Sequence, residues 1–194
     1  MDESKLCLYL DSNILISYIH ERENASVNLI NKIRQKKWAC FTSSFSALEI
    51  YDFERLEAWV QAKRTKHWTY DQIMRNYSKR HGDAIGLTNE QLESVFITIR
   101  DWLSSFEGYI TFKRINDDIS INSETLCRKT NMSGADALHL ATALHTGCNM
   151  IVTNDDDFLG LIKLLRKSEP SKYPIATRAK GFENAFNDYI KLGA

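Results

Sequence analysis

The chain lacks most features that mark secreted, disulfide-bonded or membrane proteins. Only two prolines occur among its 194 residues, and no low-complexity stretch marks a linker between domains. No apolar run approaches the roughly 18 residues that span a bilayer. The four cysteines include no C-x-x-C pair, so buried free thiols are expected rather than a disulfide framework or a zinc site. The acidic N-terminal residues do not resemble a signal peptide. We therefore expect a cytoplasmic protein without a membrane segment.

The chain also lacks net charge, with 25 basic and 25 acidic residues, which argues against a general polyanion binder. The distribution is uneven. Residues 55–81 contain seven basic and two acidic side chains. Residues 163–180 contain six basic side chains and one acidic side chain. Residues 82–157 between them hold twelve acidic and five basic groups. An acidic centre with basic flanks suits a protein that binds a metal ion beside phosphates, although each basic cluster alone is equally consistent with a solvated helix face.

Hydrophobic periodicity predicts strands that alternate with helices. Strands are expected at 6–10 and 38–42, both of buried type, and at 109–115 and 149–153, with a short edge strand at 173–176. Helices are expected at 13–19, 25–37, 118–130, 135–145, 158–167 and 182–192. Two further helices are expected to begin at residue 46 and at a Thr88-x-x-Gln91 capping box. Residues 62–87 are polar, basic and weakly patterned. The alternation predicts a mostly parallel, three-layer α/β fold. We expect one domain over 1–194, with a helical insertion at about 60–106 and a C-terminal extension at about 168–194.

Carboxylates follow the predicted strands or begin the predicted helices. Asp11 directly follows an apolar strand, which fits a Mg²⁺ ligand or a nucleophile as well as a turn or helix cap. Glu49 and Asp136 each have a structural explanation, because Ser46-x-x-Glu49 is a capping box and Ser133 precedes Asp136 as an N-cap. Parallel strands bring their carboxyl ends to one edge, however, and a capping box does not require these acids to converge there.

The run Asp155–Asp157 follows another apolar strand. Three consecutive carboxylates are unfavourable without a cation or basic neighbours. Asp155, nearest the strand, is the better ligand candidate, whereas Asp157 is also explained as the start of a helix. Carboxylates suit Mg²⁺ or Mn²⁺ rather than zinc. His139 and His145 have no cysteine or carboxylate at a metal-ligand spacing, so they are expected to be core or surface residues.

The order of these segments resembles the PIN-domain nuclease family. The matching stretches are residues 8–15 (LYLDSNIL), Thr42-Ser43 with Glu49, residues 133–143 (SGADALHLATA) and residues 151–158 (IVTNDDDF). The resemblance implies a sheet of strand order 3-2-1-4-5 and an acidic pocket that binds Mg²⁺ or Mn²⁺. It implies Asp11, Glu49, Asp136 and Asp155 as the catalytic acids, and Asp11, Asp136, Asp155 and Asp157 as metal ligands. It also implies that Asn13, Ser43 and Thr153 support the pocket.

Many small bacterial and archaeal members of this family are VapC-type toxins of type II toxin–antitoxin pairs, which cut RNA and often form homodimers. The resemblance therefore implies a metal-dependent endoribonuclease, with an antitoxin as a partner. This chain is longer than the compact toxins, and the excess lies in the insertion and the C-terminal extension. Both regions overlap the basic clusters at 55–81 and 163–180. The departure weakens the toxin assignment more than the nuclease assignment.

A basic segment within the insertion is the candidate RNA-binding region. Lys63, Arg64 and Lys66 could follow a single-stranded or structured RNA backbone, and aromatic side chains beside them could stack on bases or pack the insertion. These aromatic residues are Trp68, Tyr70 and Tyr77. Two alternatives stay open: a non-catalytic PIN-like module that binds nucleic acid or a partner, and an Asp-nucleophile phosphohydrolase. The phosphohydrolase alternative requires a second aspartate that acts as an acid, and Asp11-Ser12-Asn13 does not contain one.

Overall fold

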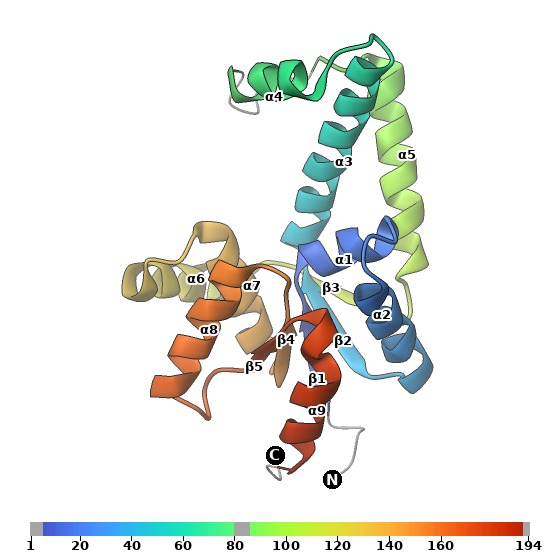
Figure 1. Cartoon of the computed structure of the whole chain (residues 1–194). Helices are drawn as coiled ribbons and strands as arrows, with labels where there is room; N and C mark the ends of the chain where they lie inside the picture. Colours follow the sequence, from blue (N-terminus) through green and yellow to red (C-terminus); the bar gives the residue numbers. More distant parts are fainter. Residues whose placement is uncertain (1–5, 80–85, 192–194) are drawn as a thin grey trace. The chain divides into compact units, whose positions relative to one another are not determined.

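A computed structural model describes residues 6–79 and 86–191 of the chain (Figure 1). Its centre is a five-stranded sheet in the order β3-β2-β1-β4-β5, in which every neighbouring pair is parallel. The expected α/β class and strand order are confirmed. The strands are β1 (Cys7–Leu10), β2 (Ala39–Ser43), β3 (Thr111–Lys113), β4 (Met150–Val152) and β5 (Ile175–Thr177).

Helices cover both faces of this sheet and make three layers. Figure 1 shows α6 (Asp117–Thr130), α7 (Gly134–His145) and α8 (Asp156–Ser168) on one side. On the other side lie α1 (Ser12–Ile19), α2 (Asn24–Lys36) and the C-terminal α9 (Phe182–Lys191), which follows the short 3-10 helix η2 (Ala179–Gly181). Residue 192, at the end of the expected C-terminal helix, lies outside the described residues.

The central strands β1 and β4 are apolar because both of their faces are buried. Leu8, Tyr9 and Leu10 of β1 are fully buried, as expected for a central parallel strand. On one face, Tyr9 belongs to a cluster with Leu140 of α7 and Phe158 of α8. Alanines of α7 are also fully buried in that cluster, and their small side chains let the helix lie close to the sheet.

The chain divides into two compact units, Met1–Ala47 with Phe106–Ala194, and Leu48–Ser105. The sheet belongs to the first unit. The second contains most of α3 (Ser44–Arg64), together with α4 (Tyr70–Lys79) and α5 (Asn89–Ser105). In this second unit Trp59 packs against Tyr77 with ring centroids 6.3 Å apart, and Tyr51 stacks on Phe96 at 4.8 Å. The division into one domain with an insertion stays a prediction.

Capping boxes explain where two helices of the second unit begin. The predicted box at Thr88 is present, because Gln91 Oε1 accepts from Thr88 N at 2.9 Å and Thr88 Oγ1 accepts from Gln91 N at 3.3 Å. Thr69 and Gln72 make the same pair of bonds at the start of α4, at 2.8 and 3.3 Å. We did not expect α4, since residues 62–87 are weakly patterned. None of the described helices combines the length and hydrophobicity that crossing a bilayer demands.

Candidate active site

Asp11 occupies the carboxyl end of the central strand β1. It is the N-cap of α1, and only 6% of its surface is exposed. Burying a carboxylate is costly unless its oxygens are hydrogen-bonded. Oδ1 accepts from Ser12 N at 2.8 Å, and Oδ2 accepts from Asn13 Nδ2 at 2.7 Å and from Thr153 Oγ1 at 2.6 Å. The side chain is thus held in one orientation by three donors.

Thr153 connects this carboxylate to the end of the neighbouring strand β4. Its hydroxyl donates to Asp11 and accepts from Asn13 Nδ2 at 3.1 Å and from Asp155 N at 3.0 Å. These three bonds use the full hydrogen-bonding capacity of a hydroxyl. Asn13 Oδ1 in turn accepts from Asn154 N at 3.0 Å. Asn13 and Thr153 therefore join the ends of β1 and β4 into one network that contains Asp11 and the backbone of Asp155.

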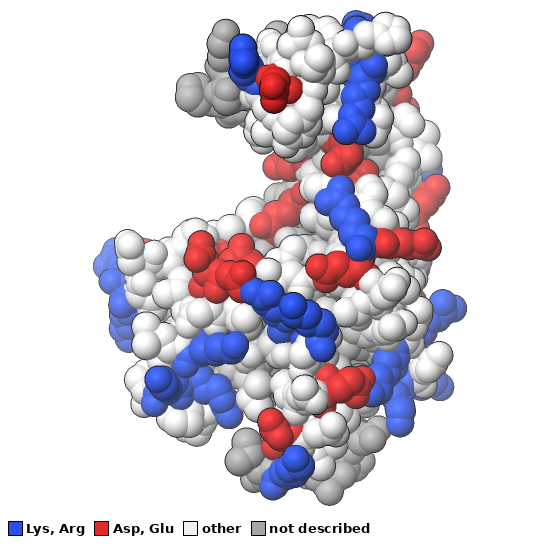
Figure 2. Space-filling view, in the orientation of Figure 1, with Lys and Arg blue, Asp and Glu red and all other residues white. Residues whose placement is uncertain are grey.

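Asp155 begins helix α8. Its Oδ1 accepts from Asp157 N and from Phe158 N, both at 2.9 Å, so it is a true N-cap. Both bonds end on Oδ1, which leaves Oδ2 outside the cap. Asp155 and Asp157 are exposed, and Asp156 forms an ion pair with Arg178. Arg178 and the positive end of the helix dipole therefore offset part of the repulsion within this acidic run. Figure 2 shows acidic side chains gathered where α6, α7 and α8 are labelled in Figure 1, with basic side chains beside them.

Asp136 lies in the first turn of α7, as the sequence indicates. Ser133 is the N-cap: its Oγ accepts from Asp136 N at 3.1 Å and donates to Asp136 Oδ2 at 2.8 Å. One turn later, His139 is buried with 2% of its surface exposed. Its Nε2 lies 3.6 Å from Asp11 Oδ1. Helix α7 therefore carries Asp136 on the turn before a histidine that contacts the buried carboxylate.

His139 is the site residue that sequence reasoning missed. The expectation of a core residue is right, but the statement that it has no carboxylate at ligand spacing is wrong. Asp136 precedes it by three residues, a spacing that puts both side chains on one face of a helix. That i, i+3 relation is the signal that the sequence contains.

Tyr9 fixes the orientation of the His139 ring. Its hydroxyl lies 2.7 Å from His139 Nδ1. Burial, and then the nearby charge of Asp11, raise the pKa of Tyr9 well above its usual 10, so the phenol keeps its proton. The phenol and Nδ1 share one hydrogen bond, and the other ring nitrogen, Nε2, faces Asp11. Tyr9, His139 and Asp11 thus form a chain of polar contacts through the core.

Ser43 ends β2 and is fully buried, and its Oγ accepts from Phe45 N at 3.0 Å, at the start of α3. Because α3 begins at Ser44, Ser46 lies inside the helix, where its hydroxyl is 2.7 Å from Thr42 Oγ1. The capping-box explanation of Glu49 is therefore wrong. Glu49 belongs to the second compact unit, so its participation in the site stays a prediction.

The predicted RNA-binding residues lie at the end of α3. Arg64 and Lys66 are exposed, whereas Lys63 is half-buried. Its Nζ lies 4.6 Å from the ring centroid of Trp68 and 5.6 Å from that of Trp59. Tyr70 is 66% exposed, while Tyr77 packs on Trp59. Packing therefore accounts for Tyr77 and for part of the Lys63 side chain, and Arg80 lies outside the described residues.

The candidate donors at this sheet edge are of the kind that a hard divalent cation binds. Asp11 and Asp155 follow adjacent strands and Asp136 lies in the first turn of α7, so their carboxylates are the candidate oxygen ligands. Oxygen ligands of this kind suit Mg²⁺ and Mn²⁺. His139 is the single histidine beside Asp11, at 3.6 Å, and one histidine is too little for a zinc site of the usual histidine and thiolate type.

Comparisons with known proteins agree with this geometry. Residues 8–163 match the family model described as the PIN domain, and this range includes every acidic residue discussed above. None of the curated proteins matches the chain significantly. The chain is similar to one in the crystal structure of VapBC2 from Rickettsia felis bound to a DNA fragment from their promoter. That similarity has a TM-score of 0.50 and 13% identity, and it covers 89% of this chain and 98% of that one. At such low identity the likeness concerns the fold.

Proposed function

This chain belongs to the PIN-domain family, and from that premise we propose that it is a Mg²⁺- or Mn²⁺-dependent endoribonuclease that hydrolyses RNA phosphodiester bonds. The observation that carries the proposal is the buried Asp11 carboxylate. Three donors hold it at the carboxyl edge of a parallel sheet, where such folds bind their ligands. A buried charge that is held so firmly is more than a helix cap requires.

The acidic set would hold the metal, with Asp11, Asp136 and Asp155 as ligands, Asp157 as an auxiliary ligand, and Glu49 as the fourth catalytic acid. A bound Mg²⁺ or Mn²⁺ would make water a better nucleophile at neutral pH and would stabilise negative charge on the phosphate. No covalent protein nucleophile is required.

The other residues of the site would position these carboxylates. Thr153 and Asn13 orient Asp11, and Ser133 orients Asp136. His139, held by Tyr9, places Nε2 3.6 Å from Asp11 Oδ1. Partners of this kind fix the rotamers of ligand side chains and are commonly worth about 10–100-fold in metal affinity or activity.

RNA as the substrate is supported by the basic end of α3. Exposed Arg64 and Lys66, with Lys63 beside them, would bind backbone phosphates, and Tyr70 offers an exposed ring for stacking. Phosphate contacts of this type are electrostatic and weaken as salt rises.

The likeness to the VapBC2 structure also supports a role as the toxin of a toxin–antitoxin pair. On this proposal the chain acts in the cytoplasm as a homodimer and binds an antitoxin protein. Growth arrest on expression, relieved by the product of a neighbouring gene, would support the role. Unimpaired growth with an active nuclease would contradict it and favour an RNA-processing enzyme.

Cleavage of labelled single-stranded RNA in Mn²⁺ tests the nuclease proposal. Wild type should cleave, and Asp136→Asn should lose cleavage because it removes one metal-binding charge. Asp101→Asn is the matched control, since Asp101 is an exposed aspartate of α5 and should leave the rate unchanged. Equal cleavage by wild type and Asp136→Asn would indicate a contaminating nuclease and overturn the assignment. If wild type and both variants bind RNA but none of them cleaves it, the result would favour the non-catalytic module.

A further inference from the structure

Two cysteines lie together at the end of the sheet opposite to the acidic site. Cys7 is the first residue of β1, and Cys148 lies two residues before β4. Their sulfur atoms are 3.4 Å apart and hydrogen-bonded. Cys148 belongs to the core cluster between the sheet and α6, α7 and α8, and Cys7 packs against that cluster.

The surrounding backbone holds these thiols in place. Asn149 accepts from Cys7 N through Oδ1 at 2.9 Å and donates its own N–H to Cys7 O at 2.8 Å. Thr146 Oγ1 lies 3.2 Å from Cys148 Sγ, and Cys7 Sγ lies 3.9 Å from Thr146 O. The short distance between the sulfurs is thus a consequence of the sheet register and of the turn after α7.

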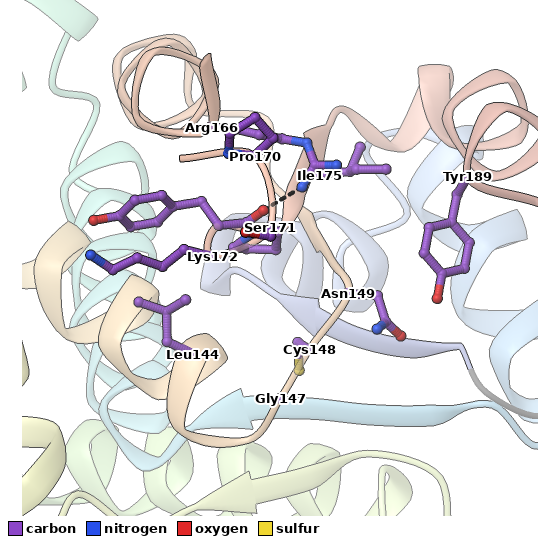
Figure 3. A pocket seen from close by; sticks show the side chains of 12 residues that line it. Leu144, Gly147, Cys148, Asn149, Arg166, Pro170, Ser171, Lys172, Ile175 and Tyr189 are labelled. Carbon is purple, nitrogen blue, oxygen red and sulfur yellow. Dashed lines mark hydrogen bonds between the residues drawn. The ribbon is translucent and has the colours of Figure 1, made fainter. Parts of the chain in front are cut away.

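The two thiols differ in exposure. Cys7 is half-buried, and Cys148 lies in the wall of a cavity of about 390 Å³. Figure 3 shows Cys148 between Gly147 and Asn149, with Arg166 and Lys172 among the side chains that line the same cavity. A small neutral molecule would therefore meet Cys7 first, and Cys148 lies next to it.

Their hydrogen bond also makes the two thiols unequal. It lowers the pKa of Cys7 and raises that of Cys148, and burial raises the pKa of Cys148 further. Cys7 is therefore the better thiolate and nucleophile, and Cys148 keeps its proton.

We propose that Cys7 and Cys148 form a peroxide-reactive dithiol, a modification site at which hydrogen peroxide closes an intramolecular disulfide. The Cys7 thiolate attacks one peroxide oxygen, the O–O bond breaks, and hydroxide leaves to be protonated to water. The Cys148 sulfur then attacks the sulfenic sulfur of Cys7, the S–O bond breaks, and the oxygen departs as a second water with the Cys148 proton. Two thiols are oxidised, and one peroxide is reduced to two waters.

The other two cysteines provide internal controls. Cys40 pairs with Leu8 in the sheet register, so its side chain points to the face opposite that of Cys7. Cys127 is on α6, where its Sγ lies 3.9 Å from Ser133 O. Cleavage after lysine and arginine places each cysteine in a separate peptide, at residues 6–22, 38–55, 115–128 and 130–163.

The test is peptide mapping of the full chain after hydrogen peroxide treatment, alkylation and tryptic digestion without reductant. The expected product is peptide 6–22 joined to peptide 130–163, with the combined mass reduced by two hydrogen atoms and with sensitivity to dithiothreitol.

Cys127→Ser and Cys40→Ala should still give this product, and Cys148→Ser should instead give a Cys7 sulfenic acid that a dimedone probe traps. Peptides 6–22 and 130–163 that stay unlinked in peroxide-treated wild type would overturn the proposal. Linkage of peptide 6–22 to peptide 38–55 or 115–128 to the same extent would also overturn it.

Discussion

Burial gives Asp11 different physical properties from the other acids of the site. Asp155 and Asp157 are exposed, whereas Asp11 is surrounded by Ser12, Asn13, Thr153 and His139. Each of these groups points a polar atom at the carboxylate, so its charge is stabilised before any metal arrives. At the residue scale, the proposed chemistry therefore depends on the partners of Asp11 as much as on Asp11 itself.

Thr153→Val tests that dependence. Valine keeps the shape of threonine but removes the donor to Asp11 and the acceptor for Asp155 N. We expect a loss of about 1–3 kcal/mol in the free energy of unfolding, since buried polar atoms lose their partner, and a decrease of about 10–100-fold in RNA cleavage. Urea denaturation and initial cleavage rates measure the two effects. Thr125→Val, at an exposed position of α6, is the matched control. Wild-type cleavage by Thr153→Val would contradict the positioning role.

Tyr9 gives a prediction for pH dependence. Because burial raises the pKa of Tyr9 above its usual 10, the folded protein keeps the phenol proton after the unfolded chain loses it. This group's contribution to stability is complete below pH 10 and is lost as the pH rises further, by up to ~1.4 kcal/mol per pH unit. Urea midpoints of wild type and Tyr9→Phe, compared near pH 8 and above about pH 10, should show a smaller alkaline loss in the variant. Parallel losses in both proteins would contradict the prediction.

Some residues of the candidate site could be predicted from the sequence and others could not. Asp11 was predictable because it directly follows an apolar strand and parallel strands align their ends, whereas Asn13 and Thr153 came from the resemblance to a known family. His139 was not identified, because its neighbour across the sheet, Asp11, is distant in sequence. A helix period indicates which face His139 shares with Asp136, but only the packing of α7 against β1 brings it to Asp11.

At the scale of elements, three helix N-termini gather at the carboxyl edge of the sheet. Asp11 caps α1, Ser133 caps α7 and Asp155 caps α8. Capping and ligand binding first seemed competing explanations of these acids. They are compatible, because a carboxylate has two oxygens and the cap of α8 uses only Oδ1 of Asp155. The helix dipoles also favour negative charge at this edge.

Two substitutions of Asp155 separate the cap from the proposed catalytic role. Asp155→Asn keeps a capping oxygen and should change the free energy of unfolding little, whereas Asp155→Ala should cost about 0.5–2 kcal/mol. Both should lose RNA cleavage, because both remove the charge. Thermal denaturation and cleavage rates, measured on the same preparations, decide the matter. An active Asp155→Asn would show that Asp155 only caps α8.

The basic end of α3 gives the prediction for RNA binding. Arg64→Gln with Lys66→Gln should weaken binding and reduce the slope of log affinity against log salt by about 0.7 for each lost single-strand phosphate contact. Lys63→Gln, added as a third change, tests a residue that also packs on Trp68. Lys36→Gln with Lys129→Gln, two exposed lysines of α2 and α6, is the control. An unchanged slope in the triple variant would exclude this segment as the RNA-binding region.

Local signals predicted most elements, and the failures have physical causes. The central strands β1 and β4 were found because they are buried and apolar, and α5 because its capping box precedes a periodic helix. Helix α4 has the same kind of box at Thr69, but its polar sequence offers little hydrophobic periodicity to support it. Ser46 failed as a cap because α3 begins at Ser44, directly after β2. Helix starts at strand ends depend on chain geometry that a capping motif does not contain.

At the scale of the whole molecule, the α/β class followed from the alternation of strands and helices. The strand order 3-2-1-4-5 could not be derived from this alternation, because any permutation of parallel strands fits the same pattern. The order came from the resemblance to a known family. The described chain then adds a second property that no motif indicated. Strands β1 and β4 carry an acidic network at their carboxyl ends and two close thiols at or just before their amino ends.

The central claim is that Asp11 belongs to a metal-dependent site that cleaves RNA. The most direct test is the rate of cleavage of labelled single-stranded RNA as Mn²⁺ is titrated, for wild type and for Asp11→Asn of equal helical content. We predict saturable Mn²⁺ dependence in wild type, complete loss of activity with a chelator, and a rate at least about 100-fold lower for Asp11→Asn at every Mn²⁺ concentration. Cleavage by Asp11→Asn at the wild-type rate, or wild-type cleavage that persists in the chelator, would contradict the claim.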